Sequence, residues 1–328
     1  MSPVLALERL FHPLVKIHPR LDTSEGTKIG GAMDEGVQKT AEHYTKQWGE
    51  ELDFKNFIQE NPEAAKAMPS RQLPWQELFD RIRQEAKDRD VMVYDAACGF
   101  GDILRSLTVA PNPTRLRYVG ADIHGSLNTI GRPGNAELVQ WDITKPLLNG
   151  GKFDFIICRA AIHHTPDPQT TYSVLVSQLA PGGTLAITAY AKKAPMREAV
   201  DDEMRRRVMP MSNDEAFTVA NQFTKLGRDL QTCDGLIEIA EDLPFLGIRA
   251  GRYKVQEFIY KHFMKCWHNL AFSQRHCDLV NFDWYHPPYA YRYDMSELER
   301  WARDNGLAIV RQASTDAQHY LEGVRALI

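Results

Sequence analysis

The sequence predicts an α/β protein whose core is a mainly parallel β-sheet with helices on both faces. Four short apolar runs between residues 90 and 160 each end in a polar residue, and helical or turn segments separate them. A fifth apolar run follows a Pro-Gly-Gly turn at residues 181–183. Strands that alternate with helices at this spacing are typical of a parallel sheet wound on both faces.

Two helices are expected before the sheet. In the first, which begins near Asp34, Val37, Ala41, Tyr44 and Trp48 recur at spacings of four, three and four residues, which places them on one helical face. The second begins near Pro74 and carries its own apolar stripe, made of Trp75, Leu78, Phe79 and Ile82. Residues 1–35 are mixed in character and are predicted only as an arm.

The five predicted strands cover residues 91–95, 116–122, 136–142, 153–159 and 184–189. After Tyr190 the alternation stops for nearly a hundred residues that look helical, and their clearest stripe comprises Val255, Phe258, Ile259, Phe263, Met264 and Trp267. The alternation then resumes with a helix at 295–305, a strand at 307–311 and a last strand near 319–327. The helical stretch is therefore predicted to be an insertion within the sheet domain.

These patterns divide the chain into four parts. We expect an N-terminal arm with covering helices over residues 1–89, followed by a ligand-binding core over 90–190. A helical lid for the substrate is expected over 191–290, and the end of the core sheet over 291–328.

Composition favours a globular protein without a nucleic-acid partner. Of the 328 residues, 43% are hydrophobic and 25% are charged, and the formal net charge is -4, so no global basic field attracts nucleic acid. The densest basic run, Arg205 to Arg207, is interpreted as a solvated helix face.

The cysteines favour a reducing compartment. There are five, without CxxC spacing, and such an unpatterned odd number predicts free thiols and a cytoplasmic protein. No stretch has the roughly 18–20 apolar residues of a membrane span, and the N-terminus does not resemble a signal peptide. No complete zinc spacing exists, so we predict no metal site among His262, Cys266, His268, His276 and Cys277.

A glycine-containing turn follows the first predicted strand, in the segment Asp95-Ala-Ala-Cys-Gly99-Phe-Gly101. Residues without side chains allow the backbone to turn sharply and to approach a ligand closely. Asp122 ends the second strand, and a carboxylate at that position can accept both hydroxyl protons of a ribose. Because open parallel sheets bind ligands at the carboxyl ends of their strands, this region is the expected binding site.

A nicotinamide dinucleotide is the main rival ligand, and its fingerprint is GxGxxG. In this chain Leu104 stands where the third glycine would be, and Asp102 would bring negative charge to the pyrophosphate. A cofactor with a ribose and no phosphate, such as S-adenosylmethionine, fits the turn better.

Five segments in order resemble the signature segments of class I S-adenosylmethionine-dependent methyltransferases, with the closest pattern in the small-molecule group that includes the ubiquinone/menaquinone enzymes. They are DAACGFG, VGADIH, QWDIT, FDFIICRAAIHHTPDP and LAPGGTLAITAYA. The resemblance covers residues 90–190 in strict order and 295–328 more loosely. It implies a Rossmann-like, seven-stranded, mostly parallel sheet with an antiparallel last strand. Ala97 departs from the family, which usually has a glycine there.

The resemblance also implies roles for individual residues. Asp122 would bind the ribose hydroxyls with Ile123 against the adenine, and Asp142 would accept from the adenine amino group with Ile143 beside it. The remaining expected cofactor residues are Asp95, Ala97, Gly99 and Gly101 in the loop, and Arg159 and Ala160 on the methyl-donor side. For each acid, the alternative is a helix cap or turn residue.

Candidate catalytic residues lie in two places. His163 and His164 follow the fourth strand, where an imidazole could accept a proton from the acceptor. The resemblance implies that such a pair more often packs or hydrogen-bonds to hold the loop, and no base need exist. Tyr285 and His286 lie in an aromatic-rich segment, interpreted as a substrate-facing loop, whose HPPY resembles a nucleic-acid methyltransferase motif in the wrong position. Tyr44 would bring an aromatic ring to the cofactor's sulfonium, or would pack in the core.

The expected reaction is methyl transfer from S-adenosylmethionine to oxygen, carbon or nitrogen of a small organic acceptor. The aromatic insertion favours an acceptor with a hydrophobic or ring portion. Two alternatives stay open: a protein that binds or uses the cofactor without methyl transfer, and a methyltransferase that acts on protein or nucleic acid.

Overall fold

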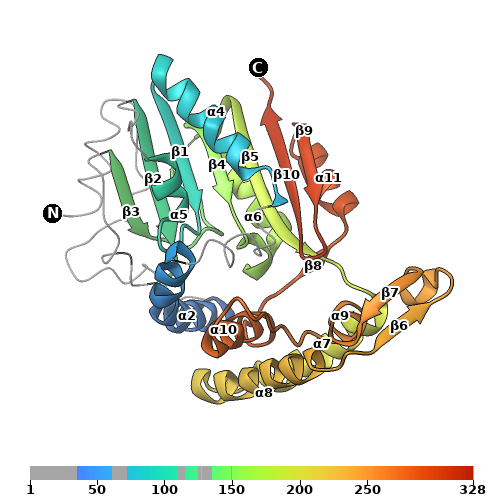
Figure 1. The fold of residues 1–328 in the computed structure, drawn as a ribbon. Coiled ribbons are helices and arrows are strands. Elements are labelled where there is room, and N and C mark those ends of the chain that lie inside the picture. Colours follow the sequence, from blue (N-terminus) through green and yellow to red (C-terminus); the bar gives the residue numbers. More distant parts are fainter. Residues whose placement is uncertain are drawn as a thin grey trace. The chain divides into compact units, whose positions relative to one another are not determined.

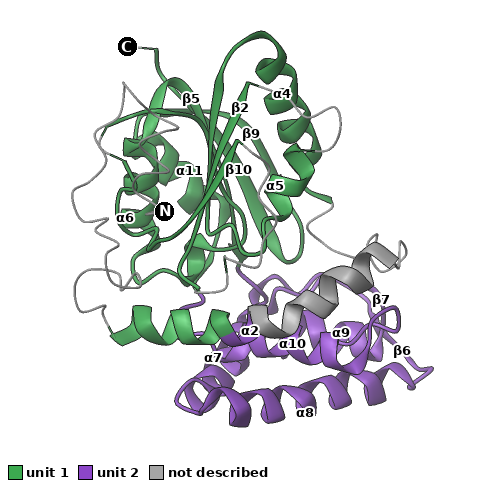
Figure 2. Ribbon diagram, turned by 90° about the vertical axis from the view of Figure 1, so that its left-hand side faces the viewer, with its two compact units in different colours: residues 1–45, 69–191, 291–328 green, residues 46–68, 192–290 purple. Residues whose placement is uncertain are grey.

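The computed structural model describes residues 35–60, 72–108, 115–124, 127, 135–148 and 150–327, and within the first range it describes side chains only from 35 to 47. Most of the predicted N-terminal arm and the Trp48 side chain lie outside this part. The chain divides into two compact units (Figure 2). The first contains residues 1–45, 69–191 and 291–328, and the second contains residues 46–68 and 192–290.

The first unit is built on a mostly parallel sheet (Figure 1). Its strand order is β3-β2-β1-β4-β5-β10-β9, and β10 runs antiparallel to both of its neighbours. For the described residues, the predicted seven strands with an antiparallel last strand are therefore confirmed. The strands are β1 (Val91–Ala96), β2 (Leu116–Asp122), β3 (Ala136–Gln140), β4 (Phe153–Cys158), β5 (Leu179–Ala191), β9 (Leu307–Ser314) and β10 (Gln318–Arg325). A short strand, β8 (Arg292–Tyr293), adds to the end of β5.

Helices cover both faces of this sheet, as Figures 1 and 2 show. One face carries α4 (Trp75–Asp88) and α5 (Asp102–Leu107), and the other carries α6 (Pro168–Ser177) and α11 (Met295–Asp304). The predicted stripe of α4 is buried, and burial of each such large apolar side chain stabilises the fold by roughly 1.5–3 kcal/mol. The opposite face buries Tyr172, Leu175, Leu298 and Trp301 in one apolar cluster with the strands.

The first helix, α2 (Glu35–Glu60), buries a different face from the predicted one. Its buried side chains are Val37, Thr40, His43 and Gln47, whereas Ala41 and Tyr44 are half-buried. Polar side chains can be buried there because they find partners; the Thr40 hydroxyl, for example, donates to the Gly36 carbonyl at 2.8 Å. The apolar stripe alone therefore indicated the helix correctly and its buried face incorrectly.

The second unit is mainly helical, as predicted, but also contains a hairpin that was not predicted. Its helices are α7 (Pro195–Val208), α8 (Asn213–Gln231), α9 (Val255–His262) and α10 (Gln274–Tyr285), with a 3-10 turn, η4, at Pro244–Leu246. Strands β6 (Leu236–Ile239) and β7 (Gly251–Lys254) pair antiparallel. Because both strands are short and none of their residues is buried, they carry no strong apolar pattern.

Two expectations for this unit are wrong in detail. The predicted stripe through Trp267 is not one helix, since α9 ends at His262 and Phe263 has left helical geometry. Arg205 is not part of a solvated face: it is buried, and its guanidinium donates to the backbone carbonyls of Trp284 and Pro287. The carbonyls at the end of α10 are the ordinary acceptors for such a group. Arg206 and Arg207 are exposed and pair with Glu203.

All five cysteines are free thiols. Among the helices that the structure describes, none is long and apolar enough to span a bilayer. The described part of the chain also contains no group of three or more histidine, cysteine or acidic side chains arranged to hold a metal ion.

Candidate functional site

The turn after β1 has the backbone geometry that the glycines predicted. Ala97, Gly99 and Gly101 all have positive φ, at 67°, 50° and 76°. The amides of Ala97 and Cys98 both donate to the carbonyl of Ala121, at 2.8 and 2.9 Å, and so tie the turn to β2. Left-handed geometry is easy for glycine and costs alanine about 1 kcal/mol or more. The turn is thus held open at the carboxyl end of the sheet.

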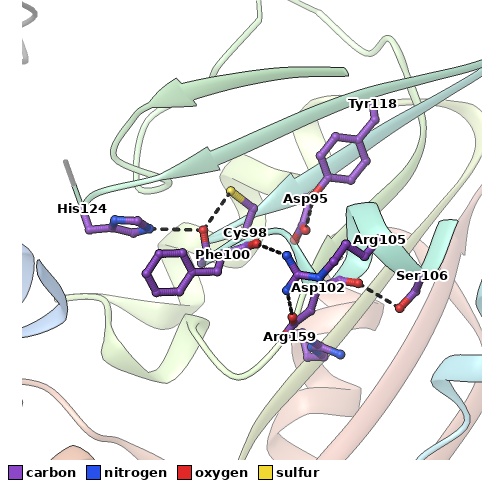
Figure 3. Close-up of polar contacts among 10 residues, drawn as sticks. Asp95, Cys98, Phe100, Asp102, Arg105, Ser106, Tyr118, His124 and Arg159 are labelled. Carbon is purple, nitrogen blue, oxygen red and sulfur yellow. Dashed lines mark hydrogen bonds and ion pairs between the residues drawn. The ribbon is translucent and has the colours of Figure 1, made fainter. Parts of the chain in front are cut away.

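Asp95, which lies near the end of β1, is fully buried and only half satisfied (Figure 3). The Tyr118 hydroxyl donates to its Oδ2, whereas no described group donates to its Oδ1. Burial raises the pKa of this carboxyl to about 7, although the Tyr118 hydrogen bond and the nearby Arg159 charge oppose the rise. A buried carboxyl oxygen without a donor is costly unless a ligand supplies one.

Asp122, at the tip of β2, holds the glycine turn. Its Oδ2 accepts from the amide of Gly99 at 2.8 Å and its Oδ1 from the amide of His124 at 3.2 Å. The His124 ring returns to the turn, with Nε2 3.2 Å from the Gly99 carbonyl oxygen. Because a carboxylate offers about four acceptor positions, this acid can hold the turn and still accept from a ligand.

Gly120 leaves the space that this arrangement needs. A Cβ on Gly120 would lie 2.7 Å from Leu138 Cδ2 and 3.0 Å from both Cys98 Sγ and the Tyr118 ring. Sequence reasoning missed Tyr118 and His124 as members of the site. The available signal was Gly120 itself, because a glycine inside a strand often marks a close approach of another group.

Asp142 lies beside Asp122 at the neighbouring strand end, where the amide of Trp141 donates to the Asp122 carbonyl at 2.8 Å. Asp142 Oδ1 accepts from the amide and hydroxyl of Thr144, at 3.0 and 2.7 Å, so Asp142 also forms a local turn. Ile143 is buried in the core cluster, and Ile123 is half-buried with its carbonyl accepting from Gln140. The turn role that was held open as the alternative for Asp142 is therefore present.

Arg159 follows β4 and faces the glycine turn (Figure 3). Its Nη2 lies 3.4 Å from Asp102 Oδ2, and Asp102 also pairs with Arg105. These two cations compensate the charge of Asp102, so its repulsion of a pyrophosphate is weaker than expected. The case against a dinucleotide now depends on Leu104, which is buried where the third glycine of that fingerprint would stand.

His163 and His164 belong to a second cluster, formed by rings at the carboxyl ends of β4 and β5. Both lie in η3 (Ile162–His164), and the His163 ring centroid is 3.8 Å from that of Tyr190 and 4.2 Å from that of His164. The Tyr44 ring is 5.5 Å from His164. Within the described residues, neither ring nitrogen of His163 has a hydrogen-bond partner. Burial, helped by His164 and opposed by the Thr188 backbone, keeps the pKa of His163 well below its usual value.

Tyr285 is not in a loop, which corrects the prediction for that residue, whereas His286 is the first residue after α10. Tyr285 is the last residue of α10 and is buried; its hydroxyl lies 2.8 Å from Asp201 Oδ1 and 2.7 Å from the Lys265 carbonyl. His286 Nε2 lies 3.1 Å from the Met211 carbonyl. The aromatic run is helical because Ser273 caps α10 and Trp284 and Phe282 bury their rings. Both candidates lie in the second unit and have internal partners.

The structure thus brings the predicted residues together in three groups. The turn residues, Asp95 and Asp122 form one connected polar site, with Asp142 and Arg159 on neighbouring strand ends. Tyr44 joins the two histidines in the ring cluster. Tyr285 and His286 belong to a different part of the molecule.

Comparison with known proteins gives one match to a family model and one curated relative at low coverage. Residues 94–185 match the family model Methyltransf_12, described as a methyltransferase domain. An uncharacterised protein of Synechococcus sp. is 31% identical over 106 residues, which cover 30% of this chain. The aligned part spans only about a quarter (25%) of the length of that relative.

Three solved structures have low similarity to the chain. A chain of the complex that contains the Haloferax volcanii Trm112 methyltransferase activator has a TM-score of 0.44 and 14% identity, with 90% of this chain and 100% of that chain covered. For 1,6-didemethyltoxoflavin-N1-methyltransferase of Burkholderia thailandensis the TM-score is 0.41 and the identity 11%, with 90% of this chain and 93% of that chain covered. For an O-methyltransferase family protein of the same organism the TM-score is 0.38 and the identity 15%, with 88% of this chain and 72% of that chain covered.

The family match and the site geometry identify the same segment. It contains the glycine turn after β1, the acids at the strand tips and the two histidines. Residues 94–185 match a methyltransferase domain, and the sheet that contains them has a mostly parallel strand order with β10 antiparallel to both of its neighbours.

Proposed function

We propose that this protein transfers a methyl group from S-adenosylmethionine to an oxygen, carbon or nitrogen atom of a small organic acceptor. The observation that carries the proposal is the half-satisfied site at the strand tips. There, a buried carboxyl oxygen of Asp95 has no donor among the described residues, beside a turn held open by Asp122.

The residues present fit the cofactor. Asp122 has acceptor positions left for the ribose hydroxyls, and Asp95 Oδ1 can accept from an amino or hydroxyl group of the bound molecule. The turn at Gly99 and Gly101 lets the backbone approach closely. Asp142 and Ile143, with Ile123, would hold the adenine, and Arg159 and Ala97 would line the rest of the site.

When bound, the cofactor supplies an electrophilic methyl group on a sulfonium. What the chain must add is an acceptor held in line at close range, and the ring cluster of Tyr44, His163, His164 and Tyr190 supports an acceptor with a ring or hydrophobic part. Because the pKa of His163 is far below its usual value, the ring is neutral near pH 7. In the neutral ring one nitrogen donates and the other accepts, so His163 can offer one hydrogen bond of each kind to the acceptor.

We further propose that residues 192–290 serve as the lid. The chain leaves the sheet after Ala191 at the carboxyl end of β5 and returns through β8, which pairs with Tyr190 and Ala191. Both junctions therefore lie at the end of the sheet where the site is built. Tyr285 and His286 have internal partners, so we do not assign them to the acceptor.

The experiment is calorimetric binding of S-adenosylhomocysteine, the expected product, to the wild type and to Asp122→Ala. Loss of two charge-assisted hydrogen bonds, together with the Gly99 anchor, should weaken binding about 100-fold. Asp154→Ala is the matched control, because Asp154 also accepts from a backbone amide (Met92, 2.8 Å) but lies at the opposite end of the sheet. We expect the control to change affinity by less than about twofold.

Methyl transfer is tested with methyl-labelled donor and pooled metabolites. Label should move to an acceptor with the wild type and with Asp154→Ala, and not with Asp122→Ala. Unchanged product affinity in a folded Asp122→Ala protein would refute the cofactor site. Tight product binding without any labelled acceptor would refute methyl transfer while leaving the site intact.

A further inference from the structure

The second unit contains a cluster of two buried cations, Arg197 and Lys265, and the half-buried Lys193 around a single indole ring. The Lys265 Nζ lies 4.7 Å from the centroid of the Trp284 ring, the Arg197 guanidinium carbon 5.4 Å and the Lys193 Nζ 5.9 Å. Arg197 also stacks over Tyr260 at 4.5 Å. All these residues lie within residues 192–290, mainly on α7 and α10 and in the segment that follows α9 (Figure 2).

The buried carboxylate in contact with this cluster already accepts hydrogen bonds from described groups. Asp201 has no exposed surface, and four donors lie within hydrogen-bonding distance of its two oxygens. They are the Arg197 Nε (3.1 Å), the Trp284 Nε1 (2.9 Å), the Tyr285 hydroxyl (2.8 Å) and the backbone amide of Lys265 (2.9 Å). The Tyr285 hydroxyl has a single hydrogen and also lies 2.7 Å from the Lys265 carbonyl oxygen, so it is shared between the two acceptors, whereas the other three donors are directed at Asp201.

The amine of Lys265 is buried beside this carboxylate without a described hydrogen bond to it. The residue is 7% exposed, and among the described residues its Nζ has neither a hydrogen bond nor an ion pair. Burial lowers the pKa of Lys265 to about 7, and the Asp283 and Asp201 charges only partly oppose this. Buried lysines are rarely found without a paired charge, because taking an ammonium out of water costs several kcal/mol.

We propose that Lys265 and Arg197 bind the carboxylate of a small organic anion, with the Trp284 ring as one wall of the site. The terminal nitrogens of Arg197 have no described hydrogen-bond partner, and a guanidinium fork matches a carboxylate. Trp284 and Tyr260 add aromatic faces, which favour a ligand with a flat apolar part. This site is independent of the proposed methyl transfer.

Carboxylates also lie near this cluster. Asp283 and Asp201 act on Lys265, and Glu198 Oε1 accepts from the backbone amide of Lys193 at 2.7 Å. Burial raises the pKa of Cys266 to about 11 and that of Tyr285 above its usual value, so both stay neutral near pH 7.

The test is calorimetric titration with benzoate at pH 6.5, with benzamide as the neutral probe of the same shape. We expect benzoate to bind the wild type at least about tenfold more tightly than benzamide does. Lys265→Met should weaken benzoate binding about tenfold or more, and Lys265→Arg should keep it within about threefold. The matched control is Lys225→Met, an exposed lysine on α8, which should change the affinity by less than about twofold.

Titration at several pH values separates a binding site from a structural cluster. Benzoate affinity of the wild type should fall about tenfold from pH 6 to 8.5 as Lys265 loses its proton, and that of Lys265→Arg should stay constant. The proposal is overturned if the folded wild type binds benzoate no better than benzamide, or if folded Lys265→Met keeps wild-type affinity. Tighter binding of inorganic phosphate than of benzoate would overturn the carboxylate assignment. Because the wild-type comparison needs no variant, it holds even if Lys265→Met fails to fold.

Discussion

Asp95 in the first unit and Asp201 in the second are both completely buried, yet their hydrogen bonding is opposite. Asp201 is surrounded by four donors, one of them the guanidinium of Arg197. Asp95 has one described donor, the Tyr118 hydroxyl, and an oxygen that lacks any. Burial alone therefore does not distinguish a structural acid from a ligand-binding one, whereas the count of donors does.

The same contrast exists within the second unit. Both carboxylate oxygens of Asp201 accept hydrogen bonds from described donors. One of those donors is the backbone amide of Lys265, whose side-chain nitrogen has no described hydrogen-bond partner. Asp95 Oδ1 in the first unit and Lys265 Nζ in the second are thus two buried polar atoms with no hydrogen-bond partner among the described residues. We assign those two groups to ligands and Asp201 to the architecture of the second unit, and the variants below test this division.

The largest effect is expected for Asp201→Ala. Its removal leaves the Arg197 charge buried without compensation and frees the donors of Trp284 and Tyr285. Breaking a buried ion pair from one side costs 3–5 kcal/mol, and with the lost neutral hydrogen bonds we expect about 5 kcal/mol or more of destabilisation. Urea unfolding followed by circular dichroism measures the loss.

The control is Asp202→Ala, which changes the exposed neighbour on the same helix. It should stay within about 1 kcal/mol of the wild type. If Asp201→Ala were no more destabilising than this control, the four short contacts would not stabilise the unit and the contrast with Asp95 would be lost.

The opposite sign is expected for Asp95→Asn. Because the folded-state pKa of Asp95 is about 7, the native protein keeps this proton between about pH 4 and 7 while the unfolded chain loses it. Stability that is present below pH 4 is therefore lost as the pH rises to 7, by about 4 kcal/mol from this group. The neutral amide does not titrate, so the free energy of unfolding of Asp95→Asn should rise relative to that of the wild type between pH 4 and 7.

The measurement is the free energy of unfolding of both proteins from pH 4 to 8. Asp88→Asn, an exposed acid at the end of α4, should follow the wild-type curve. Parallel curves for wild type and Asp95→Asn would show that Asp95 is ionised in the fold at low pH. Binding of S-adenosylhomocysteine should weaken in Asp95→Asn although the folded protein becomes more stable, because the substitution removes the carboxyl group that the ligand would contact.

Much of the first unit could be predicted from the sequence because its signals are local. Each strand is a short apolar run, and the acids Asp95, Asp122 and Asp142 come at known distances along those runs, so parallel pairing brings their ends to one edge. The partners Tyr118 and His124 were missed, because their roles depend on how close β2 lies to the turn. That distance is set by Gly120 packing and not by any periodicity.

The second unit was harder for a physical reason. The contacts of Asp201 with Lys265, Trp284 and Tyr285 join residues 64 to 84 positions apart. No local pattern encodes such pairs. Sequence reasoning therefore identified the aromatic segment and interpreted Tyr285 as loop, whereas α10 continues through it. The hairpin β6–β7 was not predicted for another reason: none of its residues is buried, so its sequence has no alternating apolar pattern.

The smallest effect is expected at Ala97, where the chain departs from the glycine that the family pattern has. Ala97 has a φ of 67°, so glycine would remove about 1 kcal/mol of backbone strain, while its extra freedom in the unfolded chain takes back about 0.4–1 kcal/mol. Ala97→Gly should therefore stabilise by at most about 0.5 kcal/mol and leave product affinity within about twofold. Ala97→Val, with a branched Cβ in the same conformation, should cost about 2 kcal/mol and weaken binding by distorting the turn. A valine variant as stable as the wild type would mean that the turn is free to change shape, and Asp95 Oδ1 could then find a partner without any ligand.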